Sequence, residues 1–346
     1  MIENVDYRYI SCDEIDTPQY KDFVEKYHGK GSYESWKQRL LWYWQRGNAN
    51  FKVFTASIDG HFAGQSCAYR VYISINNRIE ELWWGVDTFV LPEYRGKGIG
   101  KRLQKELHQA LPNFSSAWYS PTNGVIKRKC GGHSLFSFPF AFYPVSSFIS
   151  ILLELGVKKM FNYKGTMPRV RLPWLYATLN GRLSKDYEVK EHVLQELPQL
   201  SSFMEECLKS ESFHVIRSEQ YLQWKYVCNP RTKSRVLSIN RNGKREGVVI
   251  FSESMEQNVV HAKANVVKVY DSIIAPHSCL THKDLLHVIV SYCRQHGEEL
   301  DMIKSLQNTT WYPVFFYPRH REVLSTLDIE KLPSAYLSYM DQDMEG

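Results

Sequence analysis

The sequence has no paired-cysteine pattern, no long apolar run and no strong charge imbalance. Its seven cysteines are scattered, odd in number and never spaced as C-x-x-C, which indicates reduced thiols of a cytoplasmic protein rather than disulfides or a zinc framework. No run approaches the roughly 18 apolar residues of a membrane span, and the mixed, acidic start is unlike a signal peptide. The histidines show no ligand spacing, so we expect no metal site. The net charge of +6 suits an anionic ligand but does not indicate nucleic acid, which we do not expect as a partner.

What the chain has is enough length and apolar content for two cores. At 346 residues, with 43% hydrophobic and 14% aromatic residues, it exceeds one ordinary domain and fits two of roughly 170 residues.

The most informative segment runs from Val86 to Gly100. An apolar strand ends at Pro92, and Arg-Gly-Lys-Gly-Ile-Gly then turns sharply into a helix. Glycines let the backbone approach a ligand closely, and the free N–H groups at a helix start attract anions. The segment therefore predicts a pyrophosphate site. Its G-x-G-x-G spacing differs from the G-x-G-x-x-G of a Rossmann turn.

The pattern V-x-P-x-x-R-G-x-G-I-G resembles the acyl-CoA-binding signature of the GNAT superfamily (Gcn5-related N-acetyltransferases). The elements expected over residues 1–143 follow that family's order, β-α-α-β-β-β-α-β-α-β, with the last strand at 135–143. The resemblance implies backbone contacts to the CoA pyrophosphate and, on the preceding strand, to the pantetheine arm. The implied pyrophosphate residues are Arg95, Gly96, Lys97, Gly98, Ile99 and Gly100, and the implied pantetheine residues are Phe89, Val90, Leu91 and Asn123.

Residues 187–346 repeat the pattern of strands and helices without the glycines. Where the first half has its loop, this half reads Ala-Pro-His-Ser-Cys-Leu-Thr over 275–281, so we expect a degenerate second GNAT-like domain on the acceptor side. The predicted fold class is α/β (α+β), with two such domains, each a mixed, mostly antiparallel twisted sheet flanked by helices. Short motifs, among them Tyr221 to Tyr226, resemble the tandem type found among bacterial surface-polysaccharide genes.

The connector expected at 144–186 combines an apolar helix, 148–155, with a basic tail. No acidic residue occurs from 156 to 185, whereas seven lysines and arginines do. Either the helix docks on a sheet, or residues 148–185 contact an anionic membrane surface.

Direct acyl transfer to an amine needs a base for the amine, a donor for the thioester oxygen and a proton for the thiolate. We expect Asp87 or Glu81 as the base, since both lie on one face of a regular strand, although a bulge would break that parity. The family implies the Val90 N–H as the carbonyl donor. The helix after residue 120 lacks the tyrosine that many GNATs use as the acid, which leaves Tyr119 or solvent for that role.

The interpretation is an acyltransferase that passes acetyl from acetyl-CoA to an amine. The leading acceptor class is an amino sugar of surface-polysaccharide biosynthesis, free or lipid-linked. Two alternatives are a long-chain N-acyltransferase acting on an amino acid and a non-catalytic acyl-CoA-binding module.

Overall fold

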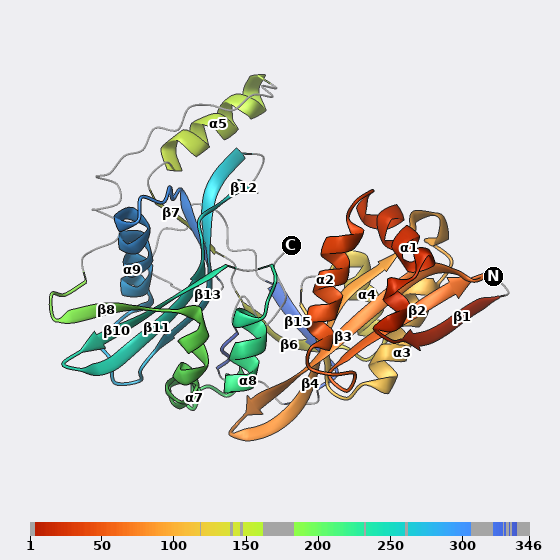
Figure 1. The fold of residues 1–346 in the computed structure, drawn as a ribbon, viewed down its shortest axis with the longest axis horizontal. Coiled ribbons are helices and arrows are strands. Elements are labelled where there is room, and N and C mark those ends of the chain that lie inside the picture. Colours follow the sequence, from red (N-terminus) through yellow and green to blue (C-terminus); the bar gives the residue numbers. More distant parts are fainter. Residues whose placement is uncertain are drawn as a thin grey trace.

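The structure is a computed structural model of the 346-residue chain (Figure 1). It describes residues 4–117, 119–138, 141–145, 148–161, 183–231, 233–259, 262–305, 321–327, 329, 332 and 334–337. Two sheets lie side by side, one for each half of the chain, as the sequence predicts.

The first sheet is built mainly from the N-terminal half. Its order is β1-β2-β3-β4-β5-β15-β6, and β9 pairs with the end of β3. The pairs are antiparallel except for β4 with β5. The strands are β1 (Val5–Ile10), β2 (Phe51–Ile58), β3 (His61–Ile75), β4 (Arg78–Val90), β5 (Phe114–Ser116), β6 (His133–Phe138), β9 (Phe213–Val215) and β15 (Arg321–Ser325).

Alternating apolar residues along these strands cover both faces of the first sheet. Val53 and Cys67 belong to the core with α1 (Pro18–His28) and α2 (Tyr33–Trp44), whereas Phe54 and Ala68 belong to the core with α3 (Ile99–Ala110). Because successive strand residues point to opposite faces, α1 and α2 cover one face and α3 the other. Helix α4 (Pro121–Lys129) lies beside α3.

The second sheet has the order β7-β14-β13-β11-β10-β8, with β12 paired to β13. Helix α9 (His282–Gln295) packs on it. The strands are β7 (Ala141–Pro144), β8 (Tyr187–His192), β10 (Ser234–Arg241), β11 (Lys244–Ser252), β12 (Met255–Val259), β13 (Ala262–Ile274) and β14 (Met302–Ser305). The helical elements are η3 (Leu194–Leu200), α7 (Ser201–Leu208), α8 (Glu219–Leu222), the π turn η4 (Gln223–Val227) and α9 (His282–Gln295).

The two sheets exchange strands. Strand β15, near the C-terminus, lies between β5 and β6 of the first sheet, and β7 pairs with β14 of the second sheet (Figure 1). The single strand expected at 135–143 is therefore two strands in different sheets. The domain boundary expected at residue 143 stays a prediction, and that residue lies within β7. The first sheet includes β15 from the C-terminal half, and the second sheet includes β7, which begins before residue 143.

Tryptophans join the two halves. The Trp42 indole N–H donates to the Trp224 carbonyl at 2.9 Å, the Trp224 indole returns the bond at 3.0 Å, and the rings stack with centroids 4.9 Å apart. Tyr221 and Tyr226, also in the polysaccharide-type motif, are buried as well. Trp224 therefore packs between the halves, whereas the Tyr226 hydroxyl donates to Asp271 of β13.

The apolar connector helix is α5 (Phe148–Phe161). It buries Glu154, which pairs with Lys158 at 2.7 Å, and it exposes Leu153, Met160 and Phe161. No helix in the described part of the chain is long and apolar enough to cross a membrane. The basic tail at 162–182 lies outside the described residues.

Candidate functional site

A cavity of about 690 Å³ lies where β4 and β5 diverge. The two parallel strands are paired at Trp83–Phe114 and Trp84–Ser115 and then separate. The cavity is lined on one side by β4 from Gly85 to Val90 and on the other by β5 and α4. The segment from Tyr94 to Lys101 lines the end of the cavity that lies beyond Val90. The loop and strand residues singled out from the sequence therefore meet in one place.

The N-terminus of α3 opens into this cavity. Its N-cap residue is Gly98, with φ +85°, and no side chain caps the first turn within the described chain. Gly96 also has a positive φ, +77°, and a Cβ built at either glycine would meet nothing within 4 Å. The loop thus leaves open space in front of uncapped backbone N–H groups, a geometry that fits a phosphate group. Lys97 is not among the lining residues, whereas Arg95, Ile99, Gly100 and Lys101 are.

A bulge in β4 sets the position of Asp87. The pairing with β3 shifts register between Gln65 and Cys67, and Asp87 has φ +50°. Its carboxylate pairs with Arg39 of α2 at 3.0 Å, and both side chains are largely buried. Asp87 lines the cavity and thus contributes a carboxylate to its wall.

Glu81 lies elsewhere. It pairs with Arg70 at 2.9 Å and accepts a hydrogen bond from the Trp83 indole at 2.6 Å, and it does not line the cavity. The bulge at Asp87 breaks the alternation that would place both acids on one face. The structure therefore brings Asp87 to the site and leaves Glu81 out.

Tyr119 lines the cavity, but its hydroxyl is engaged. It donates to Glu322 of β15 at 2.7 Å, and Arg128 also pairs with that carboxylate. Burial and this hydrogen bond raise the pKa of Tyr119. The C-terminal strand thus fixes a side chain of the N-terminal site. Glu322 is 203 positions away in the sequence, and no local pattern signals it.

The pantetheine residues implied by the resemblance lie along the cavity, except Leu91. Phe89, Val90 and Asn123 line it, whereas Leu91 is buried in the core and its N–H donates to Ala63. Phe89 stacks on Tyr27 of α1 with ring centroids 4.1 Å apart. Tyr27 also lines the cavity and was not singled out from the sequence.

A polar network lies under the cavity. The Lys127 ammonium of α4 donates to Ser116 at 2.6 Å and to Gln104 at 3.0 Å. The Gln104 amide in turn donates to Ser66 at 2.7 Å and to Thr88 at 3.0 Å. Lys127 is not singled out by the sequence pattern. Its signal there is the spacing of one helical turn after Asn123, which puts both residues on one face of α4.

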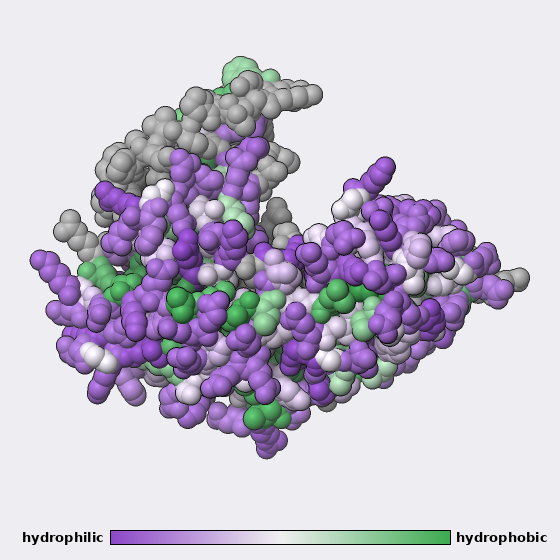
Figure 2. Space-filling view, in the orientation of Figure 1, coloured by the Kyte–Doolittle hydropathy of each residue, from purple (hydrophilic) through white to green (hydrophobic). Residues whose placement is uncertain are grey.

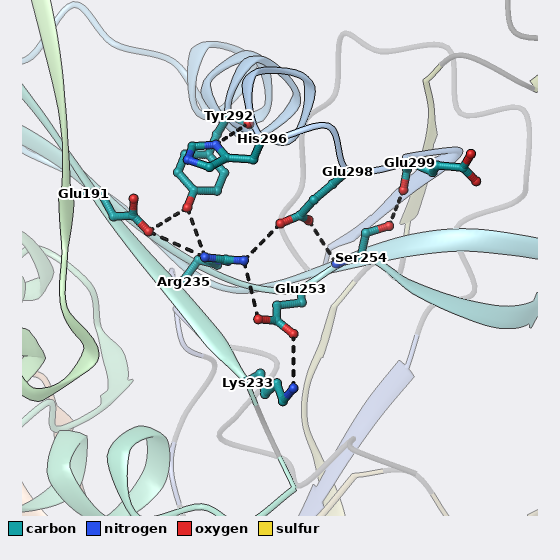
Figure 3. Close-up of polar contacts among 9 residues, drawn as sticks. All are labelled: Glu191, Lys233, Arg235, Glu253, Ser254, Tyr292, His296, Glu298 and Glu299. Carbon is teal, nitrogen blue, oxygen red and sulfur yellow. Dashed lines mark hydrogen bonds and ion pairs between the residues drawn. The ribbon is translucent and has the colours of Figure 1, made fainter.

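A second polar cluster lies in the C-terminal half, around Arg235 of β10 (Figure 3). Arg235 contacts Tyr292 at 3.2 Å, Glu298 at 3.1 Å and Glu253 at 3.4 Å. These side chains join β10 and α9 to the end of β11, and the acids are satisfied by the same arginine. We assign the cluster a structural role.

The described residues include no group of three or more histidine, cysteine, aspartate or glutamate side chains placed to hold a metal ion. All seven cysteines are free thiols.

Comparison with known proteins gives one family match and many structural neighbours. Residues 14–118 match the acetyltransferase (GNAT) family. No curated protein sequence matches the chain significantly.

The structural neighbours show the fold. A GCN5-related N-acetyltransferase from Anabaena variabilis aligns at 12% identity over 93% of this chain and 72% of its own, with a TM-score of 0.59. A tandem GNAT protein of the clavulanic acid pathway aligns at 10% identity over 94% of this chain and 100% of its own, with a TM-score of 0.57. Saccharomyces cerevisiae N-myristoyltransferase, solved with myristoyl-CoA, aligns at 9% identity over 99% and 84%, with a TM-score of 0.56.

The diverging strands, the glycine loop, the family match and these neighbours agree. The match to the acetyltransferase (GNAT) family covers residues 14–118, and the described chain has a mixed α/β fold similar to that of a solved tandem GNAT protein.

Proposed function

We propose that this protein transfers an acetyl group from acetyl-CoA to an amine. The observation that carries the proposal is the cavity of about 690 Å³ that ends at the uncapped N-terminus of α3. With the pyrophosphate of acetyl-CoA bound at that loop, the pantetheine arm and the acetyl group would lie between β4 and β5. The coarser conclusion, an acyltransferase fold of the GNAT type, already follows from the family match.

In the proposed reaction the amine nitrogen attacks the thioester carbon, the C–S bond breaks and the amine loses a proton. Asp87 is the candidate acceptor of that proton, because its carboxylate lines the cavity and its ion pair with Arg39 holds it in place. Proton transfer by a positioned carboxylate contributes about 10²- to 10⁴-fold to a rate.

For the acceptor we propose an amino sugar of surface-polysaccharide assembly. The support is the sequence motif Tyr119 to Asn123, which resembles the tandem type of surface-polysaccharide genes and of which Tyr119, Ser120, Thr122 and Asn123 line the cavity. In Figure 2 the face of the N-terminal half that borders the hollow is largely hydrophilic. The seven free thiols fit a reducing compartment, so we place the enzyme in the cytoplasm.

A long-chain acyl donor is the second candidate. Its support is the structural likeness to the yeast N-myristoyltransferase, which was solved with myristoyl-CoA.

The test is thermal unfolding of the protein with CoA, acetyl-CoA and palmitoyl-CoA, alongside Gly98→Glu. A ligand at 100 times its Kd stabilises the folded state by about 2.7 kcal/mol. We expect acetyl-CoA to raise the wild-type midpoint and Gly98→Glu to lose that shift, because the new side chain enters the space in front of α3. A shift with palmitoyl-CoA alone would favour the long-chain donor.

The matched control is Gly60→Glu. Gly60 has a similar φ, +78°, in the turn between β2 and β3, and open space in front of it. It carries the same backbone strain and the same added charge, so it should keep the acetyl-CoA shift. Absence of a shift with all three ligands in wild-type protein would refute the acyl-CoA assignment.

We further propose that α5 contacts an anionic membrane surface. The support is the row of exposed apolar side chains, Leu153, Met160 and Phe161, together with the basic composition of 156–185. Apolar insertion and attraction to anionic lipid act together at such surfaces. Sedimentation with vesicles should show binding to phosphatidylglycerol-containing vesicles that weakens with salt and with Met160→Glu/Phe161→Glu. Equal binding of wild type and variant would contradict it.

A further inference from the structure

The acyl-CoA cavity contains a buried lysine that the reaction described above does not use. Lys127 is 3% exposed and lines the cavity. An ammonium group has three N–H donors, and Lys127 uses two of them on Gln104 and Ser116. Within the described chain the third N–H meets no oxygen or nitrogen acceptor. The ring of Phe114 lies 5.5 Å from the nitrogen. A cavity ligand can therefore receive one hydrogen bond from Lys127.

The position of Lys127 along the cavity matters. Ser116 is the last residue of β5 and follows the last pair that β5 makes with β4, so its partner Lys127 lies near the closed end, where the strands separate. From this point β4 runs along the cavity from Gly85 to Val90, about 16 Å at ~3.3 Å per residue. The glycine loop follows Val90 and therefore lies at the opposite end of the cavity from Lys127. A CoA molecule with its pyrophosphate on the loop directs its sulfur towards the closed end.

Side chains from four elements hold the lysine in place. Ser116 of β5 and Gln104 of α3 accept from Lys127 directly. Gln104, Ser66 of β3 and Thr88 of β4 are linked to one another by hydrogen bonds of 2.6 to 3.0 Å. Thr88 directly follows Asp87 at the bulge. The network therefore connects the lysine to both arms of the cavity and leaves its side chain little freedom.

The surroundings of Lys127 contain no compensating carboxylate among its described contacts. The titratable groups that face it are His108 of α3 and Cys130 at the end of α4. Burial lowers the pKa of Lys127 to about 7, and burial together with the lysine lowers the pKa of His108 to about 4. A buried cation without an anionic partner is costly, and an anionic sulfur in the cavity would offset that cost.

We propose that Lys127 is the acid that protonates the departing CoA sulfur. This inference rests on the proposed acyl-CoA function. When the amine forms the C–N bond, the C–S electron pair passes to sulfur, and one Nζ–H proton of Lys127 moves to sulfur to give CoA–SH and a neutral lysine. The proton that the amine loses to Asp87 returns through solvent to Lys127 before the next turnover. The role is thus filled from α4 by an ammonium instead of a tyrosine.

The test measures the pKa of the thiol of bound CoA and needs no acceptor. The ultraviolet absorbance of the thiolate is followed against pH for the CoA complex, minus the same titration with S-methyl-CoA, which removes the contribution of the protein. A free cysteine thiol titrates near 8.5. We expect the thiol of CoA to titrate at least one pH unit lower in the wild-type complex than in the Lys127→Met complex, a tenfold change in the thiolate-to-thiol ratio.

Lys129→Met is the matched control, because Lys129 is exposed on the same helix, two residues away. It should behave as wild type. Lys127→Gln is a second variant that keeps a polar group, and circular dichroism checks that each variant folds. It should lose the shift as Lys127→Met does.

The outcomes are distinct. If wild-type protein binds CoA and its thiol titrates as in Lys127→Met and Lys127→Gln, this inference is overturned while the proposed function stands. If wild-type protein binds neither CoA nor S-methyl-CoA, the proposed function falls and takes the inference with it.

Discussion

Helices α3 and α9 each follow a long strand of their own half, β4 and β13, and their N-termini differ. In α3 the first turn is uncapped and preceded by glycines with positive φ. In α9 Thr281 and Asp284 form a capping box, in which each side chain accepts from the other's backbone N–H. The backbone groups that attract an anion in the first half are thus already satisfied, partly by a carboxylate, in the second.

The cavity next to α3 is also much larger than the one next to α9. The first half has about 690 Å³ between β4 and β5, whereas the matching place beside β13 and β14 has about 10 Å³. Leu285 and Leu286 of α9 and Tyr143 of the exchanged strand β7 line what remains. One fold therefore yields a ligand site or a packed core according to a few side chains at the helix start and between two strands.

The largest expected effect is a loss of stability from removing a core leucine, and a leucine of the first half is compared with one of the second. Leu324→Ala in β15 should lower the free energy of unfolding by about 3 kcal/mol, because Leu324 is buried in the first sheet. It should also weaken the stabilisation by acetyl-CoA. Leu286→Ala in the second core should cost a similar amount and leave the acetyl-CoA shift intact. Urea unfolding and ligand-dependent melting measure both; equal loss of ligand binding in the two variants would contradict the comparison.

A pH titration of stability tests the buried lysine of the first half. The pKa of Lys127 is about 7 in the folded protein, below its ordinary value of 10.5. Between these values the unfolded chain binds more protons, so folding stability should rise with pH, by up to about 1.4 kcal/mol per unit. Lys127→Met removes this slope. Urea unfolding from pH 6 to 9 measures it, and parallel curves for the two proteins would refute it.

Removing the cap of α9 should affect stability without affecting ligand binding. Thr281→Ala should cost about 1 kcal/mol, because it leaves an N–H of the first turn unsatisfied. Acetyl-CoA should stabilise the variant as much as wild type, since the second half has no room for it. A new or larger shift would show that capping alone closes the second site.

The smallest effect is expected at the cluster of Figure 3. Arg235→Met removes ion pairs that are partly exposed, and such pairs contribute at most about 1 kcal/mol. The melting temperature should change by a few degrees or less. It should also depend less on salt concentration than that of the wild type, because the ion pairs of Arg235 are gone. A loss of acetyl-CoA binding would contradict the structural role assigned to the cluster.

The sequence was sufficient for the parts of the molecule that local chemistry determines. The glycine loop, the order of elements in each half and the turn at Asp59–Gly60, with both residues at positive φ, follow from residue types and spacing. Asp87 could be named as a candidate because it precedes the loop on an apolar strand.

Parts that depend on distant contacts could not be predicted. Strand β15 is five residues long, and nothing in its sequence says that it joins the first sheet. Whether Lys127 points to solvent or into the cavity depends on α3 and β5. The parity of Glu81 and Asp87 depended on a bulge whose position the apolar pattern does not reveal.

The exchanged strands also determine when each sheet can be finished during synthesis. The second sheet needs β7, which is made early, and is complete once β14 at 302–305 has left the ribosome. The first sheet must wait for β15, and its hydrogen bond between Ser115 and Ser325 closes a span of 210 positions. Domains usually fold in the order of synthesis, yet here the half that begins the chain is the last to close. The cavity between β4 and β5 should therefore mature after the second sheet, and a nascent chain stalled before residue 321 should present a folded second sheet beside an unfinished first one.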